Sequence, residues 1–300
     1  MTKPGLAALL HPHLISDFLP HLESGESFFV KRADAVNALA QLPILKSLPQ
    51  LLETWPFQVQ AHLPKVADEA SAIDVSTTDA RKLFENGIAL MFDHAERVNA
   101  DLTHWLEAIR LDLGFSELTQ SRCLLYATPD AKGTAMHFDQ NANFVLQLHG
   151  KKKWWLAPNH SVTNPLTRHT LGLPVDPEME TYVTQPMPTK MPPDAQVIEL
   201  TPGSVLFVPA GIWHATLAEG DALALNFTYH APAWLDLLMS ALRSRLALSP
   251  EWRATAQGVS DPSRRGAACG QFDQLISDLI HDLPNWNAAD ILAATDGLDG

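Results

Sequence analysis

The chain has 300 residues, of which 46% are hydrophobic, and its formal net charge is −13. This length supports one substantial core, or a core with a smaller helical unit, and the apolar fraction is typical of a folded chain rather than a disordered one. The acidic balance argues against broad affinity for nucleic-acid backbones, which requires clustered Lys and Arg, and no run reaches the roughly 20 apolar residues that span a bilayer.

The start of the chain and its cysteines predict a cellular compartment. The opening stretch, MTKPGLAALLHPHLI, is too short and too interrupted by proline and histidine for a secretory signal. Cys123 and Cys269 lie far apart and form neither a disulfide framework nor a C-x-x-C metal knuckle. We therefore expect a cytoplasmic protein without a membrane segment.

The first third of the chain mixes short helical and extended patterns. SFFVKR (27–32) and IALMF (88–92) are typical of strands, whereas DAVNALAQL and SLPQLLETW indicate short helices. STTDARKLFENG has a Ser/Thr start, an acidic first turn and an Asn-Gly end, which predicts a helix. Residues 94–114 carry apolar side chains at helical spacing, so we expect an amphipathic helix that covers the core.

From Arg122 the pattern changes to short apolar runs separated by Gly, Pro and Asp. These runs are RCLLYAT, FVLQLHG, KKWWLAP, QVIELTPG, SVLFVPAG, HATLAEG and ALALNFTYH. Repeated short strands with this punctuation predict an antiparallel barrel or sandwich. A Pro-rich excursion over residues 158–193 interrupts them, and loops of that length in compact domains are usually functional or mobile. After Pro232 the pattern becomes helical again.

Three residues in the barrel region have the chemistry of a metal site. His137 and Asp139 are two apart, so on an extended strand both side chains leave the same face. His214, at the start of a later apolar run, is the candidate third ligand. Two His and one carboxylate on one side of an ion are the pattern of non-haem Fe(II) oxygen chemistry, although ligand type alone leaves Zn open.

A lysine of GKKKWW is a candidate anion binder next to this site. A co-substrate that binds a metal and carries a distal carboxylate needs a fixed cation some way from the ion, and a lysine can supply it. Strand alternation turns Lys152 to the opposite face from Lys151 and Lys153. The pattern alone leaves open which face points inward.

Three segments together carry a family resemblance: TAMHFDQNANFVLQLHGKKKWWLAP, LTPGSVLFVPAGIWHATL and ALALNFTYH. Over roughly residues 120–232 the chain resembles the JmjC-type, cupin-like oxygenases that use Fe(II) and 2-oxoglutarate. This group includes the asparaginyl hydroxylase of hypoxia-inducible factor, ribosomal-protein hydroxylases and a tRNA wybutosine hydroxylase. The resemblance implies a mainly β fold with flanking helices: a double-stranded β-helix of the jelly-roll or cupin type.

The resemblance also implies roles for particular residues. It assigns Fe(II) to His137, Asp139 and His214, and the distal carboxylate of 2-oxoglutarate to Lys152 and Thr134. It further places Asn143 and Asn226 beside the co-substrate. We expect three regions: an N-terminal part that packs on the barrel (1–118), the catalytic barrel (119–232) and a C-terminal helical region (233–300).

The implied activity is hydroxylation of a C–H bond, with succinate and CO₂ as co-products. We expect a protein side chain as the substrate, and the acidic chain would suit a basic protein. A small-molecule or RNA-nucleoside hydroxylase is the first alternative, and a metal-binding cupin module without catalytic activity is the second. The region after Pro232 has no Cys/His signature of a chromatin reader, so chromatin demethylation has little support.

The C-terminal region carries broad apolar stripes. AWLDLLMSALRSRLAL and QFDQLISDLIHDL are apolar over much of their circumference, so they must be covered by the barrel or by a second chain. Several members of the resembling family pair through C-terminal helices, and twofold dimers are the commonest oligomers. We therefore expect a homodimer, with packing on the barrel as the alternative.

Overall fold

The computed structural model describes residues 3–63 and 71–295, and the chain divides into two compact units. The first unit comprises residues 1–115 and 119–230, and the second comprises residues 116–118 and 231–300. The N-terminal segment and the barrel strands therefore share one unit. Among the described residues, no helix combines the length and the apolar character needed to cross a membrane.

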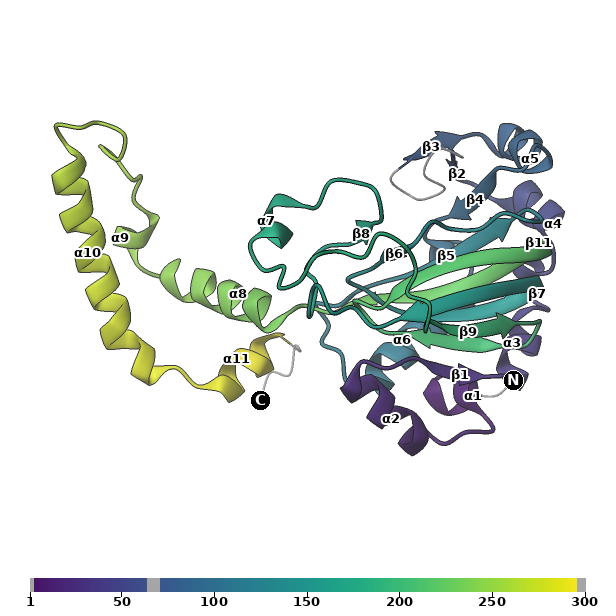
Figure 1. The fold of residues 1–300 in the computed structure, drawn as a ribbon. Helices are drawn as coiled ribbons and strands as arrows, with labels where there is room; N and C mark the ends of the chain where they lie inside the picture. Colours follow the sequence, from purple (N-terminus) through teal and green to yellow (C-terminus); the bar gives the residue numbers. More distant parts are fainter. Residues whose placement is uncertain (1–2, 64–70, 296–300) are drawn as a thin grey trace. The chain divides into compact units, whose positions relative to one another are not determined.

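The described strands of the first unit form one antiparallel sheet of 11 strands (Figure 1). Its main path runs β1-β10-β7-β11-β5-β4-β2-β3, while β6 pairs with β11 and β8, and β9 pairs with β7. The strands are β1 (Phe28–Val30), β2 (Val59–His62), β3 (Ala72–Val75), β4 (Ala89–Phe92), β5 (Gln120–Thr128), β6 (His137–Phe138), β7 (Ala142–Ala157), β8 (His169–Thr170), β9 (Gln196–Leu200), β10 (Val205–Val208) and β11 (Trp213–His230). This sheet with its flanking helices confirms the predicted mainly β fold of the jelly-roll type.

Two strands are longer than the sequence predicted. Each of β7 and β11 is continuous where two short strands were expected, with the breaks at Gly150 and Gly220. The ladder between them instead shifts register between Glu219 and Ala224. At this bulge a Cβ on Gly150 would lie 2.1 Å from the Asp221 carbonyl oxygen, so only glycine allows the two strands to approach this closely.

Helices of the first unit cover the sheet. They are α1 (Leu6–Leu10), α2 (Ile15–Ser24), α3 (Asp34–Leu39), η1 (Pro43–Leu45), α4 (Leu48–Thr54), α5 (Thr77–Glu85), η3 (Ala95–Arg97), α6 (Ala100–Asp112) and α7 (Pro177–Glu180). The helix expected over 94–114 begins only at Ala100, because His94 has a left-handed backbone and the Asn99 side chain caps the first turn. The apolar side of α6, including Leu102 and Ile109, is buried as the spacing predicted.

Alternate residues of the strands face two different apolar regions. One large core lies between the outer face of the sheet and the helices, and it takes Cys123 and Leu125 of β5 together with Phe144 and Leu146 of β7. A second, smaller cluster lies inside the barrel and includes Val145. The even-numbered residues of β5 and the odd-numbered residues at the start of β7 therefore point into the barrel.

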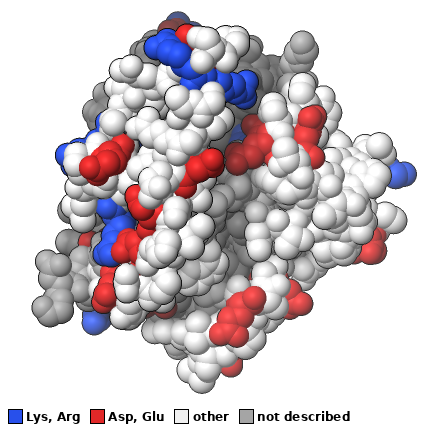
Figure 2. Space-filling model, turned by 90° about the vertical axis from the view of Figure 1, so that its left-hand side faces the viewer, with Lys and Arg blue, Asp and Glu red and all other residues white. Residues whose placement is uncertain are grey.

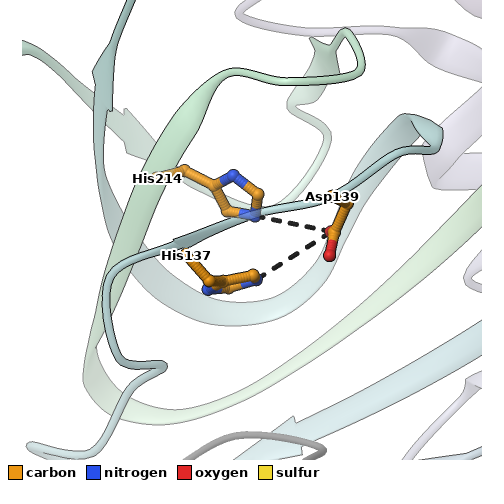
Figure 3. A group of neighbouring side chains, drawn as sticks. All are labelled: His137, Asp139 and His214. Carbon is orange, nitrogen blue, oxygen red and sulfur yellow. Dashed lines mark ion pairs between the residues drawn. The ribbon is translucent and has the colours of Figure 1, made fainter. Parts of the chain in front are cut away.

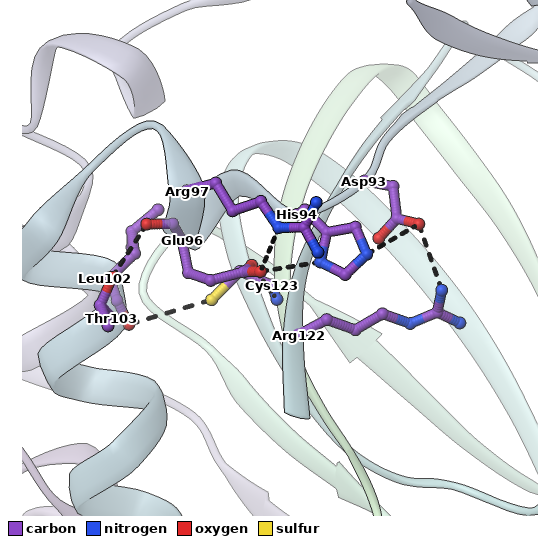
Figure 4. A network of polar contacts seen from close by, with 8 residues as sticks. All are labelled: Asp93, His94, Glu96, Arg97, Leu102, Thr103, Arg122 and Cys123. Atoms are coloured by element: carbon purple, nitrogen blue, oxygen red, sulfur yellow. Dashed lines mark hydrogen bonds and ion pairs between the residues drawn. The ribbon is translucent and has the colours of Figure 1, made fainter. Parts of the chain in front are cut away.

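A polar network fastens η3 to strand β5 (Figure 4). The Glu96 carboxylate accepts a hydrogen bond from the Cys123 backbone N–H at 2.8 Å and contacts His94 Nδ1 at 2.8 Å. Asp93 pairs with Arg122 at 3.2 Å. Burial is the main cause that raises the pKa of the Cys123 thiol, which remains neutral in this core. The network fixes the strand from which one wall of the cavity described below is built.

The Pro-rich excursion is structured rather than a plain loop. It contributes β8, which pairs with β6, and the short helix α7. Its apolar side chains Val162 and Met179 are buried against Phe138 and Trp213 of the barrel. The segment that the sequence left without periodicity thus packs directly on the strand that carries His137.

The second unit consists of helices with little burial. They are α8 (Trp234–Leu246), α9 (Pro250–Arg253), α10 (Arg265–Asp282), η4 (Leu283–Asn285) and α11 (Ala288–Thr295). An ion pair between Arg245 and Asp282 at 2.6 Å joins α8 to α10. Neither α8 nor α10 buries a residue, and apolar side chains such as Trp234 and Ile280 are exposed.

Candidate active site

All seven site residues predicted from the sequence line one cavity inside the barrel. Strand β6 and the residues beside it contribute three of them, β7 contributes two and β11 contributes two. They are Thr134, His137, Asp139, Asn143, Lys152, His214 and Asn226. The fold therefore brings together residues that lie up to 92 positions apart in the chain.

His137, Asp139 and His214 form a compact group (Figure 3). Strands β6 and β11 pair His137 directly with His214, and their ring centroids are 4.1 Å apart. Asp139 Oδ2 lies 3.9 Å from His137 Nε2 and 3.7 Å from His214 Nε2. The three ligand atoms lie within 4.8 Å of one another, a spacing at which one divalent ion can contact all of them.

Hydrogen bonds set the tautomer of both imidazoles. His137 Nδ1 donates to the Ala135 carbonyl oxygen at 2.7 Å, and His214 Nδ1 donates to the Ile212 carbonyl oxygen at 2.9 Å. Because a carbonyl can only accept, each ring carries a proton on Nδ1 and turns Nε2 toward Asp139. Burial, and next the neighbouring His137, lower the pKa of His214 to about 4, so this ring is neutral at pH 7. Both rings thus present Nε2 as the nitrogen that can contact a metal.

Lys152 is the one lysine of GKKKWW that points into the cavity. Lys151 and Lys153 face outward, where they pair with Glu199 and Glu219. The Lys152 ammonium is buried and donates to Thr128 Oγ1 at 2.8 Å. Among the described residues no carboxylate lies within ion-pair distance of it, and burial lowers the pKa of Lys152 to about 8. A buried cation with no counter-ion among these residues is suited to an anionic ligand.

Threonine and asparagine side chains complete the inner wall. Thr134 Oγ1 lies 2.9 Å from Thr216 Oγ1, and Thr228 donates to Asn143 Oδ1 at 2.7 Å. Asn226 Oδ1 is buried without a hydrogen-bond partner among the described residues. The cavity therefore offers a polar surface beside the His–Asp–His group.

Several residues of the site were not predicted from the sequence. Thr128, Thr216 and Thr228 occupy cavity-facing positions of β5 and β11, and strand alternation could have identified them once the inward face was known. Arg168 lies 3.3 Å from Asp139 Oδ1, but it comes from the excursion, where no sequence pattern marked it. Further wall residues are His62, Arg122, Leu124, Tyr126, Gln140 and Asn141.

This arrangement combines two functions in one cavity. Two imidazoles and a carboxylate on one side can hold a divalent metal and leave positions open for other ligands. A buried ammonium on a neighbouring strand can hold a carboxylate. The apolar side chains of Leu124, Val145, Val208 and Ala224 reduce the water in the space between these groups.

Comparisons with known proteins agree with this geometry. A family model described as the JmjC domain matches residues 103–237. The uncharacterized protein YxbC of Bacillus subtilis (strain 168) is 30% identical over an alignment of 296 positions, which covers 94% of this chain and 87% of that protein. The bifunctional lysine-specific demethylase and histidyl-hydroxylase NO66 of Dictyostelium discoideum is 29% identical over 132 residues, 42% of this chain but only 23% of that protein.

A solved structure shares the fold. The X-ray structure of Escherichia coli ycfD has a TM-score of 0.57 at 16% identity and covers 89% of this chain and 68% of that chain. A structure of the same protein, called a ribosomal oxygenase, in complex with cobalt and succinic acid has a TM-score of 0.53 at 15% identity, with 89% of this chain and 67% of that chain covered. The chain therefore belongs to the JmjC-type family of iron(II)- and 2-oxoglutarate-dependent oxygenases.

Proposed function

We propose that this oxygenase hydroxylates a C–H bond of a protein side chain, with succinate and CO₂ as co-products. The observation that carries the proposal is the buried Lys152 ammonium, which shares a cavity with His137, Asp139 and His214 and has no carboxylate partner among the described residues. A metal-binding module without catalytic activity would not need a cation buried at this cost. The co-substrate's carboxylate supplies the missing charge.

In the proposed site, His137, Asp139 and His214 hold the iron. Lys152 and Thr134 bind the distal carboxylate of 2-oxoglutarate, and Asn143 and Asn226 lie beside the co-substrate. Bound iron and 2-oxoglutarate would supply the oxidising chemistry: with O₂, 2-oxoglutarate would be converted to succinate and CO₂, and one oxygen atom of O₂ would enter the succinate and the other the substrate.

The chain's own residues position the reactants and exclude water. The Nδ1 hydrogen bonds of the two histidines keep both rings in the metal-binding tautomer. Thr128 orients the Lys152 ammonium, and Thr216 orients the Thr134 hydroxyl. Because these groups are held before any ligand arrives, little reorganisation is needed when it binds.

A protein is the substrate class that the comparisons support. The similar Dictyostelium protein is named a histidyl-hydroxylase, and the E. coli protein with the same fold is called a ribosomal oxygenase. The net charge of −13 would suit a basic protein. On the face drawn in Figure 2, acidic side chains occur in several separate groups, which would disfavour wide contact with a nucleic-acid backbone.

Mass spectrometry of candidate substrates tests the function. Ribosomal proteins and total RNA would be incubated separately with the enzyme, Fe(II), 2-oxoglutarate and O₂. We expect a protein peptide to gain one oxygen, and we expect the gain to disappear without 2-oxoglutarate or with the His214→Ala variant. Oxygen incorporated only into nucleosides would contradict the protein substrate, and no succinate under any condition would contradict the enzymatic role.

We further infer that the second unit mediates a homodimer. Phe272, Ile276 and Ile280 recur every four residues along α10, so they form one stripe, and each is exposed. Exposed apolar stripes of this kind are usually covered by a partner, and a second copy of the chain is the partner that twofold symmetry favours.

We also propose that the protein is cytoplasmic. Both cysteines are free, with Cys123 buried and Cys269 exposed. An exposed free thiol suits a reducing compartment.

A further inference from the structure

The two oxygens of Asp139 face different partners. Oδ2 faces the Nε2 atoms of His137 and His214, at 3.9 and 3.7 Å. Oδ1 lies 3.3 Å from Arg168 Nε on the other side of the carboxylate. We propose that Arg168 is a positioning residue for the metal site, because it holds Oδ1 and leaves Oδ2 as the single oxygen that Asp139 presents to the ion. This inference rests on the proposed metal-binding role of the His–Asp–His group.

The backbone builds this contact into the fold. In the β6–β8 ladder, His137 pairs with Thr170 and Phe138 pairs with His169. The same antiparallel register, continued by one residue, sets Asp139 opposite Arg168. Side chains of directly opposed residues lie on the same face of a sheet, so the Arg168 guanidinium comes to the carboxylate from a neighbouring strand.

Contacts on both sides hold the two residues in place. The Leu171 N–H donates to the Met136 carbonyl oxygen at 2.9 Å, which extends the ladder away from the site. The Gly211 N–H donates to the Asp139 carbonyl oxygen at 2.7 Å, which fixes the backbone of Asp139 itself. Arg168 therefore meets a carboxylate that cannot shift freely along the strand.

An aromatic cluster anchors the excursion next to Arg168. The ring of Phe138 lies 4.7 Å from that of Trp213 and 5.9 Å from that of His169, measured between centroids. These contacts attach His169, which follows Arg168, to Phe138 and Trp213. Those two residues directly precede Asp139 and His214. The sequence left the role of the excursion open. In the structure it places the Arg168 guanidinium beside Asp139 Oδ1.

The number of oxygens that Asp139 presents affects the co-substrate. A carboxylate bound through one oxygen occupies one coordination position, whereas a carboxylate bound through both occupies two. Single-oxygen binding leaves three positions open beside two histidines, as 2-oxoglutarate-dependent chemistry requires. Partners that orient metal ligands in this way typically change affinity or activity by about 10–100-fold when they are removed.

Cobalt(II) binding tests the inference without turnover. Co(II) and then 2-oxoglutarate would be titrated into wild-type protein and into Arg168→Gln, Arg168→Lys and Lys153→Gln variants. Lys153 faces outward and pairs with Glu219 at 3.6 Å, so its replacement removes one positive charge outside the cavity. We expect 2-oxoglutarate to bind Co(II)-loaded Arg168→Gln about tenfold more weakly or worse, Arg168→Lys to recover part of the loss, and Lys153→Gln to bind within about threefold of wild type.

Crystal structures of the Co(II)-loaded proteins give the direct readout. We expect Asp139 to bind through Oδ2 alone in the wild type, with Oδ1 on Arg168, and to rotate or bind through both oxygens in Arg168→Gln. A wild-type structure in which both oxygens bind, or in which Arg168 has left Asp139, overturns the inference, and it does so whether or not the variant folds. Failure of the wild type to bind Co(II) at all refutes the proposed metal site instead.

Discussion

The buried Lys152 ammonium destabilises the folded protein. Burial lowers its pKa from 10.5 to about 8, a shift that corresponds to roughly 3 kcal/mol of destabilisation at pH 7. The hydrogen bond to Thr128 offsets about 1 kcal/mol of this cost. Binding sites commonly keep destabilising groups of this kind because the ligand needs them.

Replacing Lys152 with methionine should therefore stabilise the protein while it weakens co-substrate binding. We expect Lys152→Met to raise the free energy of unfolding by about 2 kcal/mol at pH 7, measured by urea denaturation, and to weaken 2-oxoglutarate binding by about tenfold or more in calorimetry. The outward-facing Lys151 and Lys153 supply matched controls, since Lys151→Met and Lys153→Met should change neither quantity appreciably. A less stable Lys152→Met protein would show that the ammonium contributes to folding after all.

The same pKa sets a pH window for stability. The pKa of Lys152 lies at about 8 in the folded state and near 10.5 in the unfolded state, so the unfolded chain holds more protons between these values. Stability contributed by this residue therefore rises as pH rises from 8 to 10.5. The stability difference between Lys152→Met and wild type should shrink across that window, and unfolding curves at pH 7, 9 and 10.5 would measure it. A difference that is constant with pH would show that Lys152 does not titrate there.

The affinity for 2-oxoglutarate should fall as the pH rises, whereas the stability contributed by Lys152 rises. Only the protonated Lys152 attracts a carboxylate, and below its pKa of about 8 the residue is already charged. We expect the Kd of 2-oxoglutarate for the Co(II)-loaded protein to be nearly constant from pH 6.5 to 7.5 and to rise above pH 8. Calorimetry in buffers of different ionisation enthalpy should also reveal proton uptake above pH 8. Tighter binding at pH 9 than at pH 7 would exclude the lysine contact.

At the scale of elements, one bulge explains why the sequence left the inward lysine undecided. Asn143 and Val145 face the cavity before the bulge at Gly150, whereas Lys152 and Trp154 face it afterwards. The inward face thus changes from odd to even numbers within a single strand. Alternation counted from Asn143 would have selected Lys151 and Lys153, and only the family resemblance indicated Lys152.

Other elements could be predicted to different degrees. Well-capped helices such as α5 and strands with continuous apolar runs such as β10 were predicted because their signals are local. Helix α2 was not predicted, since it contains Pro20. The β2–β3 hairpin was also missed, because His62 faces the cavity and Ile73 is exposed, which breaks the usual apolar alternation. Long-range features, such as the β6–β8 pairing, have no local signal at all.

Glycine at position 133 is required by the close approach of two segments at the site. A Cβ on Gly133 would lie 1.7 Å from the Thr216 carbonyl oxygen, so Gly133→Ala must push β11 away from Thr134. We expect a destabilisation of about 3 kcal/mol and a loss of 2-oxoglutarate affinity. Gly266→Ala is a control, since nothing lies within 4 Å of its added Cβ. An unchanged melting temperature for Gly133→Ala would show that this approach is looser than described.

At the scale of the whole molecule, the exposed stripe on α10 predicts the oligomeric state. Light scattering of the wild type should give twice the chain mass of 33.0 kDa at micromolar concentration. Ile280 is 59% exposed, so Ile280→Glu should fold normally yet dissociate the dimer, because the charge would be buried in the interface. Gln271→Glu adds the same charge to an exposed position of α10 and should remain dimeric. A wild-type mass near that of one chain would exclude the homodimer.

The position of Lys152 has a kinetic consequence. In its proposed role it contacts the carboxylate that decarboxylation leaves untouched, so succinate retains the same contact after the reaction. Such uniform binding lowers KM without raising kcat. Lys152 variants should therefore regain turnover at high 2-oxoglutarate concentration, and the same variants should lose sensitivity to inhibition by the product. 2-Oxoglutarate and succinate differ at the end that faces the metal. The residues at that end must therefore discriminate between the two.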